Sequence, residues 1–548
     1  MRVITRGFAI LVSMTLAACF GNPPYHAVEP RGPSPDDCAK VYEVFDNAIE
    51  GVDGPGKCGS INGVDRDAND LSNCLASMVD KTTPGGINNL CWHAPSEHHS
   101  EYDLFFTEFD DQGWEADLRQ DPRTRTTEID NLFTQLTALA KTKHLDVVIY
   151  THGWHGSSDS DNYYTVLFRD FLQTLAKLDG ADRHVVGIYV GWRGDSIKFP
   201  SKYLSVWDRK VAAETVSAGA VQGLFEHLHN FYLDNSCHPS GKDSLSGKKE
   251  SCGKVHMLTI GHSFGALINF RSLLGNMESG LITPPSSRVY SFGDLVVLLN
   301  PAFEGTRYAP LYNSAVRRPA YLGLGNEIGG VQLPVIVTLQ SQGDWATGDF
   351  FPVFRHVTTV GSNLKCPEKS ANDQALPCPE KSESAHAMGW VSEFATHKLC
   401  LAPYAKSPNF AEGKHPKSIC DETFAKGDEC DTTLPNVPIE MWLTCRLKKW
   451  APDGTQSVNA FSVLGSKEPI YMGEGMTLAA VPPEHGETRP DYFPYWVVKV
   501  DKSIMYDHDD VWNPLTTQLI LKLYHAVVTQ SEIISTQAIN KKNDEQKK

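Results

Sequence analysis

Residues 255–265 read Val-His-Met-Leu-Thr-Ile-Gly-His-Ser-Phe-Gly, and this stretch is the most informative about the fold. Its first six residues have the apolar character of a buried strand, and a helical spacing of apolar residues follows over 266–274. The five residues between them, Gly261-His262-Ser263-Phe264-Gly265, match G-x-S-x-G, a motif that requires this strand–turn–helix context. Larger side chains at Gly261 and Gly265 would collide in so tight a turn. The pattern therefore predicts that Ser263 is a nucleophile exposed at the end of a strand.

On both sides of this turn, segments with the residue pattern of strands alternate with segments that have the apolar spacing of helices. Such βα units indicate a mostly parallel central sheet covered by helices. We expect strands at 102–109, 146–150, 185–190, 255–260, 288–300, 335–339 and 495–500, and helices at 126–141, 163–178, 206–232, 266–274 and 516–534.

A second motif follows the strand at 146–150, where the chain continues Thr151-His152-Gly153-Trp154. Together with G-x-S-x-G, it resembles the α/β-hydrolase superfamily of serine esterases and lipases, in which His-Gly opens the oxyanion loop. The resemblance implies that the backbone N–H groups of Trp154 and Phe264 stabilise the oxyanion. It also implies that Gly153 lets the backbone approach the ligand and that His152 is a positioning residue.

The chain order of the superfamily, Ser then acid then His, implies the other two catalytic residues. Asp344 follows the strand at 335–339 and is the candidate acid, which would orient an imidazole. Glu304, one strand earlier, and Asp349 are the alternatives. If Glu304 held this place, the assignment of the acid would fail and the serine-hydrolase interpretation would stay intact.

His508 follows the predicted last strand, 495–500, and precedes the last helix, so it is the candidate base. His386 and His397 are the competitors. The neighbouring Asp507, Asp509 and Asp510 lack a regular D-x-D-x-D-G loop, so we interpret them as a solvated turn that raises the pKa of the histidine rather than as a metal site.

The resemblance extends over about 102–534. Within this range the chain is similar to a group of bacterial hydrolases, with which it has four short segments in common. These segments are Glu108–Gly113, His152–Trp154, Gly191–Gly194 and Asp344–Thr347.

The amino terminus has the pattern of an export signal. Arg2 and Arg6 precede an apolar run that is too short to span a bilayer, and Leu-Ala-Ala-Cys ends it at Cys19. This resembles the bacterial lipobox and implies cleavage before Cys19, acylation of that cysteine and a lipid-anchored protein of the cell envelope. Phe20 stands where an inner-membrane retention signal would place Asp, which favours the outer membrane.

Removing Cys19 from the thirteen cysteines leaves twelve, an even number that indicates disulfides in an exported protein. Locality suggests the pair Cys237–Cys252. No C-x₂-C knuckle supports a metal site, and we expect His98-His99 beside Glu97 to lie in an exposed polar loop rather than to bind metal. The predicted organisation is signal peptide 1–18, lipidated tether 19–37, cysteine-rich region 38–101, α/β-hydrolase core 102–345 and 491–535, an insertion at 346–490 that could cap the site, and a polar tail 536–548.

A formal charge of −16 would repel phosphate backbones and excludes nucleic acid as an expected partner. The sequence favours a membrane-anchored serine hydrolase of carboxylic esters, acting on a small ester or lipid-like substrate through an acyl-enzyme, with no metal or organic cofactor. Two alternatives stay open. They are an amide or peptide hydrolase with the same triad and a non-catalytic envelope-binding protein on the same fold.

Overall fold

The computed structural model describes residues 24–26, 38–39, 41–43, 46, 91–117, 126–180, 182–194, 206–236, 254–285, 287–322, 332–358, 379–401, 470–473, 476–483 and 488–528. The leader with Cys19, the proposed Cys237–Cys252 pair and the polar tail lie outside these residues.

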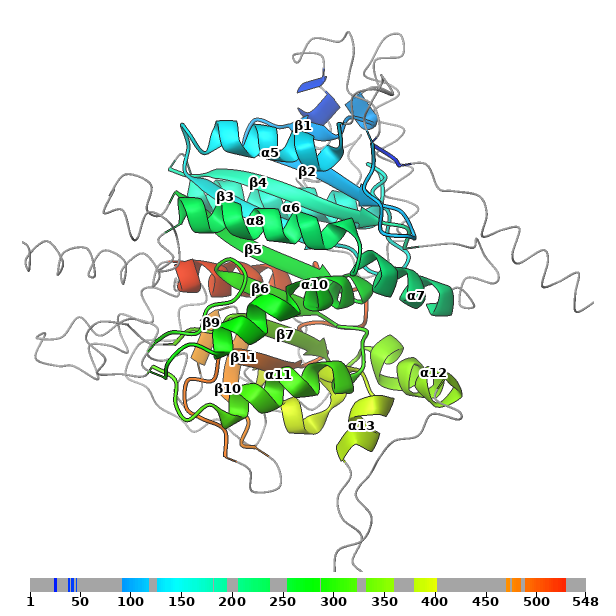
Figure 1. Cartoon of the computed structure of the whole chain (residues 1–548), viewed down its shortest axis with the longest axis vertical. Helices are drawn as coiled ribbons and strands as arrows, with labels where there is room; N and C mark the ends of the chain where they lie inside the picture. Colours follow the sequence, from blue (N-terminus) through cyan, green and yellow to red (C-terminus); the bar gives the residue numbers. More distant parts are fainter. Residues whose placement is uncertain are drawn as a thin grey trace, which may run out of the picture.

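Within the described residues, eleven strands form one mixed, mostly parallel sheet (Figure 1). Its order is β1-β2-β4-β3-β5-β6-β7-β11-β8-β10-β9, with parallel pairing from β2 to β8 and antiparallel pairing at both edges. The strands are β1 Ser96–His98, β2 Tyr102–Phe109, β3 Leu145–Thr151, β4 His184–Trp192, β5 Val255–His262, β6 Leu295–Leu299, β7 Ile336–Ser341, β8 His397–Leu401, β9 Ile470–Gly473, β10 Met476–Ala480 and β11 Tyr495–Val500.

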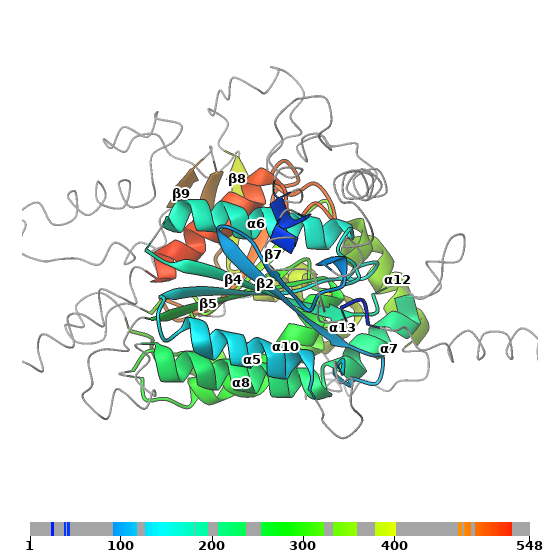
Figure 2. The same ribbon diagram turned by 90° about the horizontal axis from the view of Figure 1, so that it is seen from above.

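Helices cover both faces of the sheet, as Figure 2 shows in the view along its plane. One face packs against α5 (Glu128–Leu139), α8 (Ala220–Asn235), α10 (Phe264–Leu281) and α11 (Gly305–Arg317). The other face packs against α6 (Tyr163–Asp179) and the helical residues 514–528. The strands are buried on both sides, which explains their continuous apolar runs. The predicted mostly parallel sheet with helices on its faces is confirmed.

The helix predicted over 206–232 is instead two helices, α7 (Val206–Val216) and α8. They are separated at Gly219, where an added Cβ would lie 2.5 Å from the carbonyl oxygen of Gly113. A close backbone contact therefore sets the break. Helix α11 was not predicted.

The segment 346–490, predicted as an insertion, contributes to two separate parts of the structure. Strands β8, β9 and β10 extend the central sheet beyond β11. The π-helix Ala346–Phe350, α12 (Phe351–Thr358) and α13 (Pro379–Ala385) lie instead at the carboxyl end of the sheet, near α7 (Figures 1 and 2). The interpretation of the whole segment as a cap is therefore corrected for its three strands.

Residues 24–26 dock on the body, although they fall in the predicted tether. The backbone N–H groups of Tyr25 and His26 both donate to the Glu108 carboxylate at 2.8 Å, and the buried His26 ring stacks on Phe106. The His26 ring also lies 3.2 Å from Ser160 Oγ. A tether over the full range 19–37 is thus corrected at these residues.

The cysteine-rich region contains one disulfide between described residues, Cys38–Cys91. Nearby, Glu97 and His99 are buried, so the expected exposed loop is wrong for these two side chains. Arg169 of α6 pairs with Glu97, which explains how a carboxylate can be buried there.

In the described part of the chain, no helix has the length and apolarity needed to cross a membrane.

Candidate active site

The candidate catalytic residues come from four parallel strands and meet at their carboxyl ends. Ser263 follows β5, Trp154 follows β3, Asp344 follows β7, and His508 lies in the loop after β11. Open α/β sheets place their ligand sites at this edge, because the loops that leave parallel strands converge there.

The backbone at Ser263 is strained, with φ 56° and ψ −119°. Tight packing of the turn enforces this conformation. A Cβ at Gly265 would lie 2.1 Å from the Thr151 carbonyl oxygen, and one at Gly261 would lie 2.8 Å from Ala266 Cα. Only glycine fits at either position, so the turn holds the serine side chain at the edge of the sheet.

Ser263, His508 and Asp344 form a continuous hydrogen-bonded chain of buried side chains. His508 Nε2 lies 2.8 Å from Ser263 Oγ, and His508 Nδ1 lies 3.0 Å from Asp344 Oδ1. Because a carboxylate only accepts, Nδ1 carries a proton toward Asp344, and Nε2 can accept the serine proton. This is the geometry that the sequence analysis expected of these three residues.

The Asp344 carboxylate is held by further donors. Thr347 donates to it through its backbone N–H at 3.0 Å and through its hydroxyl, and Gln340 Nε2 donates at 3.0 Å. Burial opposes ionisation, but the charge of His508, its hydrogen bond and the two hydrogen bonds from Thr347 outweigh it and lower the pKa of Asp344. The acid is therefore ionised and fixed in orientation.

The acidic turn around His508 raises its basicity. Burial alone would lower the pKa of His508, but Asp344 and then Asp509 and Asp507 favour the charged ring and raise the pKa to about 9. The backbone of this turn is fixed by Asn300, whose side-chain amide donates to the carbonyl oxygens of Asp507 and His508 at 3.1 and 2.9 Å.

The alternative acids lie elsewhere. Glu304 is buried among Lys210, Arg307 and Arg355, which lower its pKa to about 2 against the opposing effect of burial. Asp349 is exposed on the π-helix. The structure does not bring either carboxylate to His508.

The alternative histidines have other partners too. His386 Nδ1 donates to the Ser382 carbonyl at 3.0 Å. His397 is buried in β8 beside Thr396 and Trp496, and burial lowers its pKa to about 3. Neither ring is brought to Ser263.

The two candidate oxyanion donors flank the serine. Phe264 is the first residue of α10, so its N–H has no carbonyl partner in its own helix. Trp154 follows Gly153, where an added Cβ would lie 2.7 Å from Ser263 Cβ. The oxyanion loop is therefore packed directly on the serine.

His152 is locked behind this loop. Its Nδ1 donates to the Gly153 carbonyl at 2.9 Å, and its Nε2 accepts from the Trp192 N–H at 3.1 Å. Burial lowers the pKa of His152 to about 4, so the ring is neutral. These contacts fit a positioning residue.

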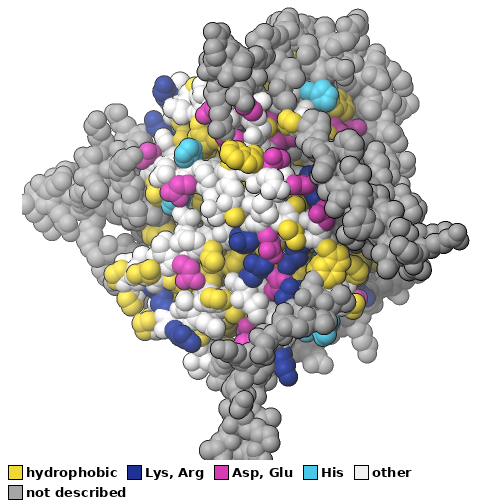
Figure 3. All heavy atoms as spheres, turned by 45° about the vertical axis from the view of Figure 1, so that its right-hand side comes forward, with side chains coloured by type: hydrophobic (Ala, Val, Ile, Leu, Met, Phe, Trp, Pro, Cys, Tyr) yellow, Lys and Arg dark blue, Asp and Glu magenta, His cyan; other side chains and the backbone are white. Residues whose placement is uncertain are grey.

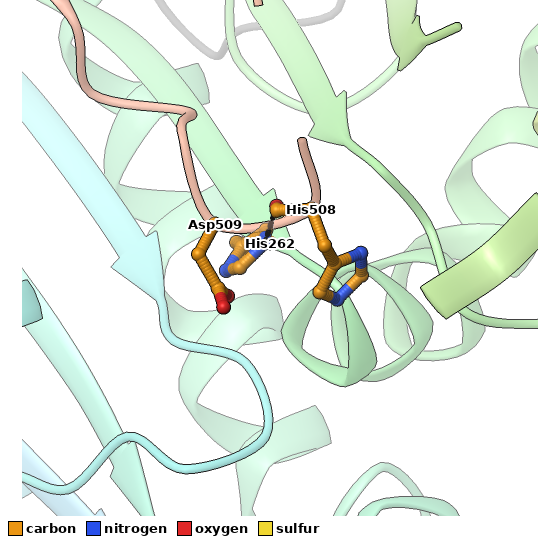
Figure 4. Close-up of side chains that lie close together, drawn as sticks. All are labelled: His262, His508 and Asp509. Atoms are coloured by element: carbon orange, nitrogen blue, oxygen red, sulfur yellow. Dashed lines mark hydrogen bonds between the residues drawn. The ribbon is translucent and has the colours of Figure 1, made fainter. Parts of the chain in front are cut away.

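His262, His508 and Asp509 lie close enough together to be considered as a metal site (Figure 4). Most of their polar atoms are engaged, although the buried His262 Nδ1 has no hydrogen-bond partner among the described residues. His262 Nε2 donates to the His508 carbonyl at 2.9 Å, the Asp509 carboxylate accepts from Tyr164 at 2.7 Å, and both nitrogens of the His508 ring bond the triad. The His508 ring lies on the side away from Asp509 (Figure 4), and its centroid is 5.0 Å from that of the His262 ring. These hydrogen bonds hold the turn at His508 and the His262 ring in place.

A narrow, mainly apolar pocket of about 30 Å³ lies against Ser263. Trp207 of α7 stacks on Phe354 of α12 beside it, with ring centroids 3.3 Å apart, so the two helices meet over the site. The pocket is lined by Trp154, Val206, Ser263, Phe264, Ala302, Ala346, Thr347, Phe350, Phe351, Phe354 and His508.

Sequence reasoning missed the residues that support the triad, namely His262, Asn300, Gln340 and Thr347. Asn300 had a usable signal. It follows β6 directly and has φ 43°, a conformation that asparagine tolerates better than most residues. Thr347 lies three residues after Asp344, where its backbone N–H can cap the carboxylate.

Comparisons of the chain with protein-family models, with curated proteins and with solved structures find no match.

Proposed function

We propose that this chain is a serine hydrolase of carboxylic esters with an α/β-hydrolase fold. One observation carries the proposal. A serine in strained backbone geometry at a strand–helix turn is hydrogen-bonded to a histidine whose other nitrogen bonds a buried carboxylate. A protein that only binds ligands has no use for the strain at Ser263, which costs of the order of 1–3 kcal/mol.

In the proposed mechanism, Ser263 Oγ attacks the ester carbonyl carbon while its proton moves to His508 Nε2. Asp344 stabilises the resulting imidazolium. The carbonyl oxygen gains the negative charge and accepts hydrogen bonds from the N–H groups of Trp154 and Phe264, each worth about 3–4 kcal/mol in related sites.

Collapse of this intermediate returns the proton from His508 to the departing alcohol and leaves an acyl group on Ser263. Water then attacks the acyl-enzyme with His508 as the base, which releases the acid and restores the serine. The same steps would cleave an amide, so activity toward matched ester and amide substrates decides between these classes.

The test is labelling with a fluorophosphonate probe and hydrolysis of a p-nitrophenyl ester. We expect wild type to be labelled and active, and Ser263→Ala to lose both properties while staying folded. Ser291→Ala is the matched control, because Ser291 is also buried and its hydroxyl has no recorded partner among the described residues. Full labelling of Ser263→Ala would refute the proposal.

We further propose that Cys19 anchors the protein to the bacterial cell envelope through lipid. Cys19→Ser should abolish metabolic labelling of the protein by palmitate and release the protein from the membrane fraction. A variant that is still acylated would show that the lipobox interpretation is wrong.

A further inference from the structure

Large apolar side chains that are exposed to solvent gather at the edge of the sheet that bears the triad. Among the described residues, seven such side chains are strongly exposed, and five of them lie at this edge, each 45–65% exposed. We call these five the apolar rim. They are Trp114, Val211, Trp345, Val353 and Tyr506.

The elements that bear the rim are in contact with one another. Val211 on α7 and Val353 on α12 belong to the two helices joined by the Trp207–Phe354 stack. Gly343, two residues before Trp345, packs so closely on the Tyr506 carbonyl that a Cβ there would lie 1.9 Å from it.

Trp114 completes the rim on the far side of α7. It follows Gly113, whose added Cβ would lie 3.0 Å from Gly219 Cα at the α7–α8 junction. Figure 3 shows this side of the molecule, with hydrophobic side chains spread around a group of charged ones. The rim residues therefore lie on the helices and loops that adjoin the pocket at Ser263, although none of the five lines the pocket itself.

The amino-terminal chain reaches the same edge. His26 lies against Glu108 at the carboxyl end of β2 and against Ser160 in the loop after β3. Cys19 is five residues before Pro24, and five extended residues span at most about 18 Å. A lipid on Cys19 would thus hold the part of the molecule around the carboxyl end of β2 close to a bilayer.

We propose that the apolar rim docks into the headgroup layer of a zwitterionic lipid leaflet, so that the mouth of the site faces lipid and the substrates are bilayer-borne esters. The proposal rests on the proposed function and on the proposed anchor at Cys19. Exposed apolar patches of this kind mark interaction surfaces, and side chains such as Trp and Tyr favour the membrane–water boundary.

Charge decides the kind of leaflet. Of the acidic side chains near the rim, Asp208 is largely exposed and paired with Arg209, and Asp349 is exposed, while the whole chain carries −16. An anionic leaflet would repel a chain of this net charge. We therefore expect docking to be strongest on phosphatidylcholine, insensitive to salt and weaker when phosphatidylglycerol is added.

The first test uses the purified full chain with phosphatidylcholine vesicles that contain brominated lipid, which quenches tryptophan fluorescence at close range. We expect the vesicles to quench the tryptophan fluorescence of the wild-type protein. The quenched fraction of this fluorescence should be smaller in Trp114→Phe and in Trp345→Phe. Trp496→Phe is the control, because Trp496 is buried in β11 and far from lipid in this orientation. Vesicle-bound protein whose quenching does not depend on Trp114 or Trp345 overturns the proposal, and so does failure to bind vesicles at millimolar lipid.

The second test separates docking from chemistry. Val211→Asp combined with Val353→Asp should lower turnover of a vesicle-embedded ester by at least about tenfold while turnover of a soluble p-nitrophenyl ester is unchanged. The matched control is Leu178→Asp combined with Ile282→Asp, because these two exposed side chains lie at the opposite ends of α6 and α10. Equal effects of the two pairs on the embedded ester overturn the proposal.

The two proposals fail in different ways. If wild type hydrolyses no ester and takes no probe, the proposed function fails, and the quenching experiment still decides docking. If wild type forms dimers that Val211→Asp with Val353→Asp separates, the rim is a contact between copies of the chain, and the lipid proposal is overturned.

Discussion

Of the buried histidines that are bonded to carboxylates, His508 and His99 make the most instructive pair, because only His508 also contacts a serine hydroxyl. His508 contacts the Asp344 carboxylate through one nitrogen and the Ser263 hydroxyl through the other. His99, beside β1, contacts Asp46 through one nitrogen and Glu97 through the other. In both cases burial lowers the pKa of the ring and the carboxylates outweigh burial and raise it.

The difference lies in the partner of the second nitrogen. Both nitrogens of His99 face carboxylates, and Arg169 pairs with one of these, Glu97. Neither partner of the His99 ring is a hydroxyl group that could act as a nucleophile. His508 is bonded on one side to a group that can give up a proton and react. A raised histidine pKa therefore does not identify a catalytic base until both ring partners are known.

The largest effect should come from His508→Ala. Loss of the base should lower kcat for ester hydrolysis by about 10⁵–10⁶, and adding Ser263→Ala should cost little more, because the two residues act as one unit. Steady-state kinetics of the single and double variants check this. If the factors by which kcat falls in the two single variants multiply in the double variant, His508 and Ser263 act separately. The catalytic role inferred for His508 in the comparison with His99 would then be wrong.

Asp344→Asn should have the next largest effect, a loss in kcat of about 10⁴, because the amide disturbs the tautomer and orientation of His508 without removing the proton acceptor. Asp349→Asn is the control, since this exposed side chain should have no effect. A larger loss in Asp349→Asn than in Asp344→Asn would reverse the assignment of the acid.

Arg169→Met tests the other histidine. It leaves the buried Glu97 without its cation and should lower the free energy of unfolding by about 3–5 kcal/mol, with kcat/KM of the folded protein unchanged. Urea denaturation of wild type and variant measures it.

The pH dependence of this loss has a definite sign. The pKa of Glu97 is lowered from 4.5 to about 2, because Arg169 and His99 outweigh burial, so its ionic contribution is present above pH 4.5 and disappears as pH falls toward 2. The difference between wild type and Arg169→Met should narrow over that range. A constant difference would mean that Arg169 acts through packing alone.

Asp509→Asn should have the smallest effect. His508 must be neutral to accept the serine proton, so kcat/KM should rise with pH as the ring loses its proton, near pH 9. Removing the charge of Asp509 lowers the pKa of His508 and moves this rise to lower pH, a change worth less than about 1.4 kcal/mol. Wild-type and variant pH–rate profiles measure the shift, and a rise that moves to higher pH contradicts it.

The fold and the triad geometry could be predicted from the sequence because their signals are local. Strands β2 and β11 match the predicted 102–109 and 495–500, since fully buried strands read as continuous apolar runs. Ser263 was identified by its flanking glycines, and Asp344 and His508 by their places after strands in chain order.

The rest depends on contacts between distant parts of the chain. His99 was expected to be exposed because nothing near it in the sequence reveals Arg169, seventy residues away. Strands β8, β9 and β10 have only four or five residues each, too few to show a period. They become strands through pairing with β11 and with one another.

The position of β11 has a consequence for biosynthesis. This strand pairs with β7 on one side and β8 on the other, although both precede it in the chain. Until residues 495–500 arrive, β7 and β8 each present an unpaired edge, a state prone to wrong pairing and aggregation. The same late segment delivers His508 to a serine 245 residues earlier. Ser263, Asp344 and His508 therefore cannot come together until residue 508 has left the ribosome, and a chain that stops before this residue lacks the histidine of the proposed triad.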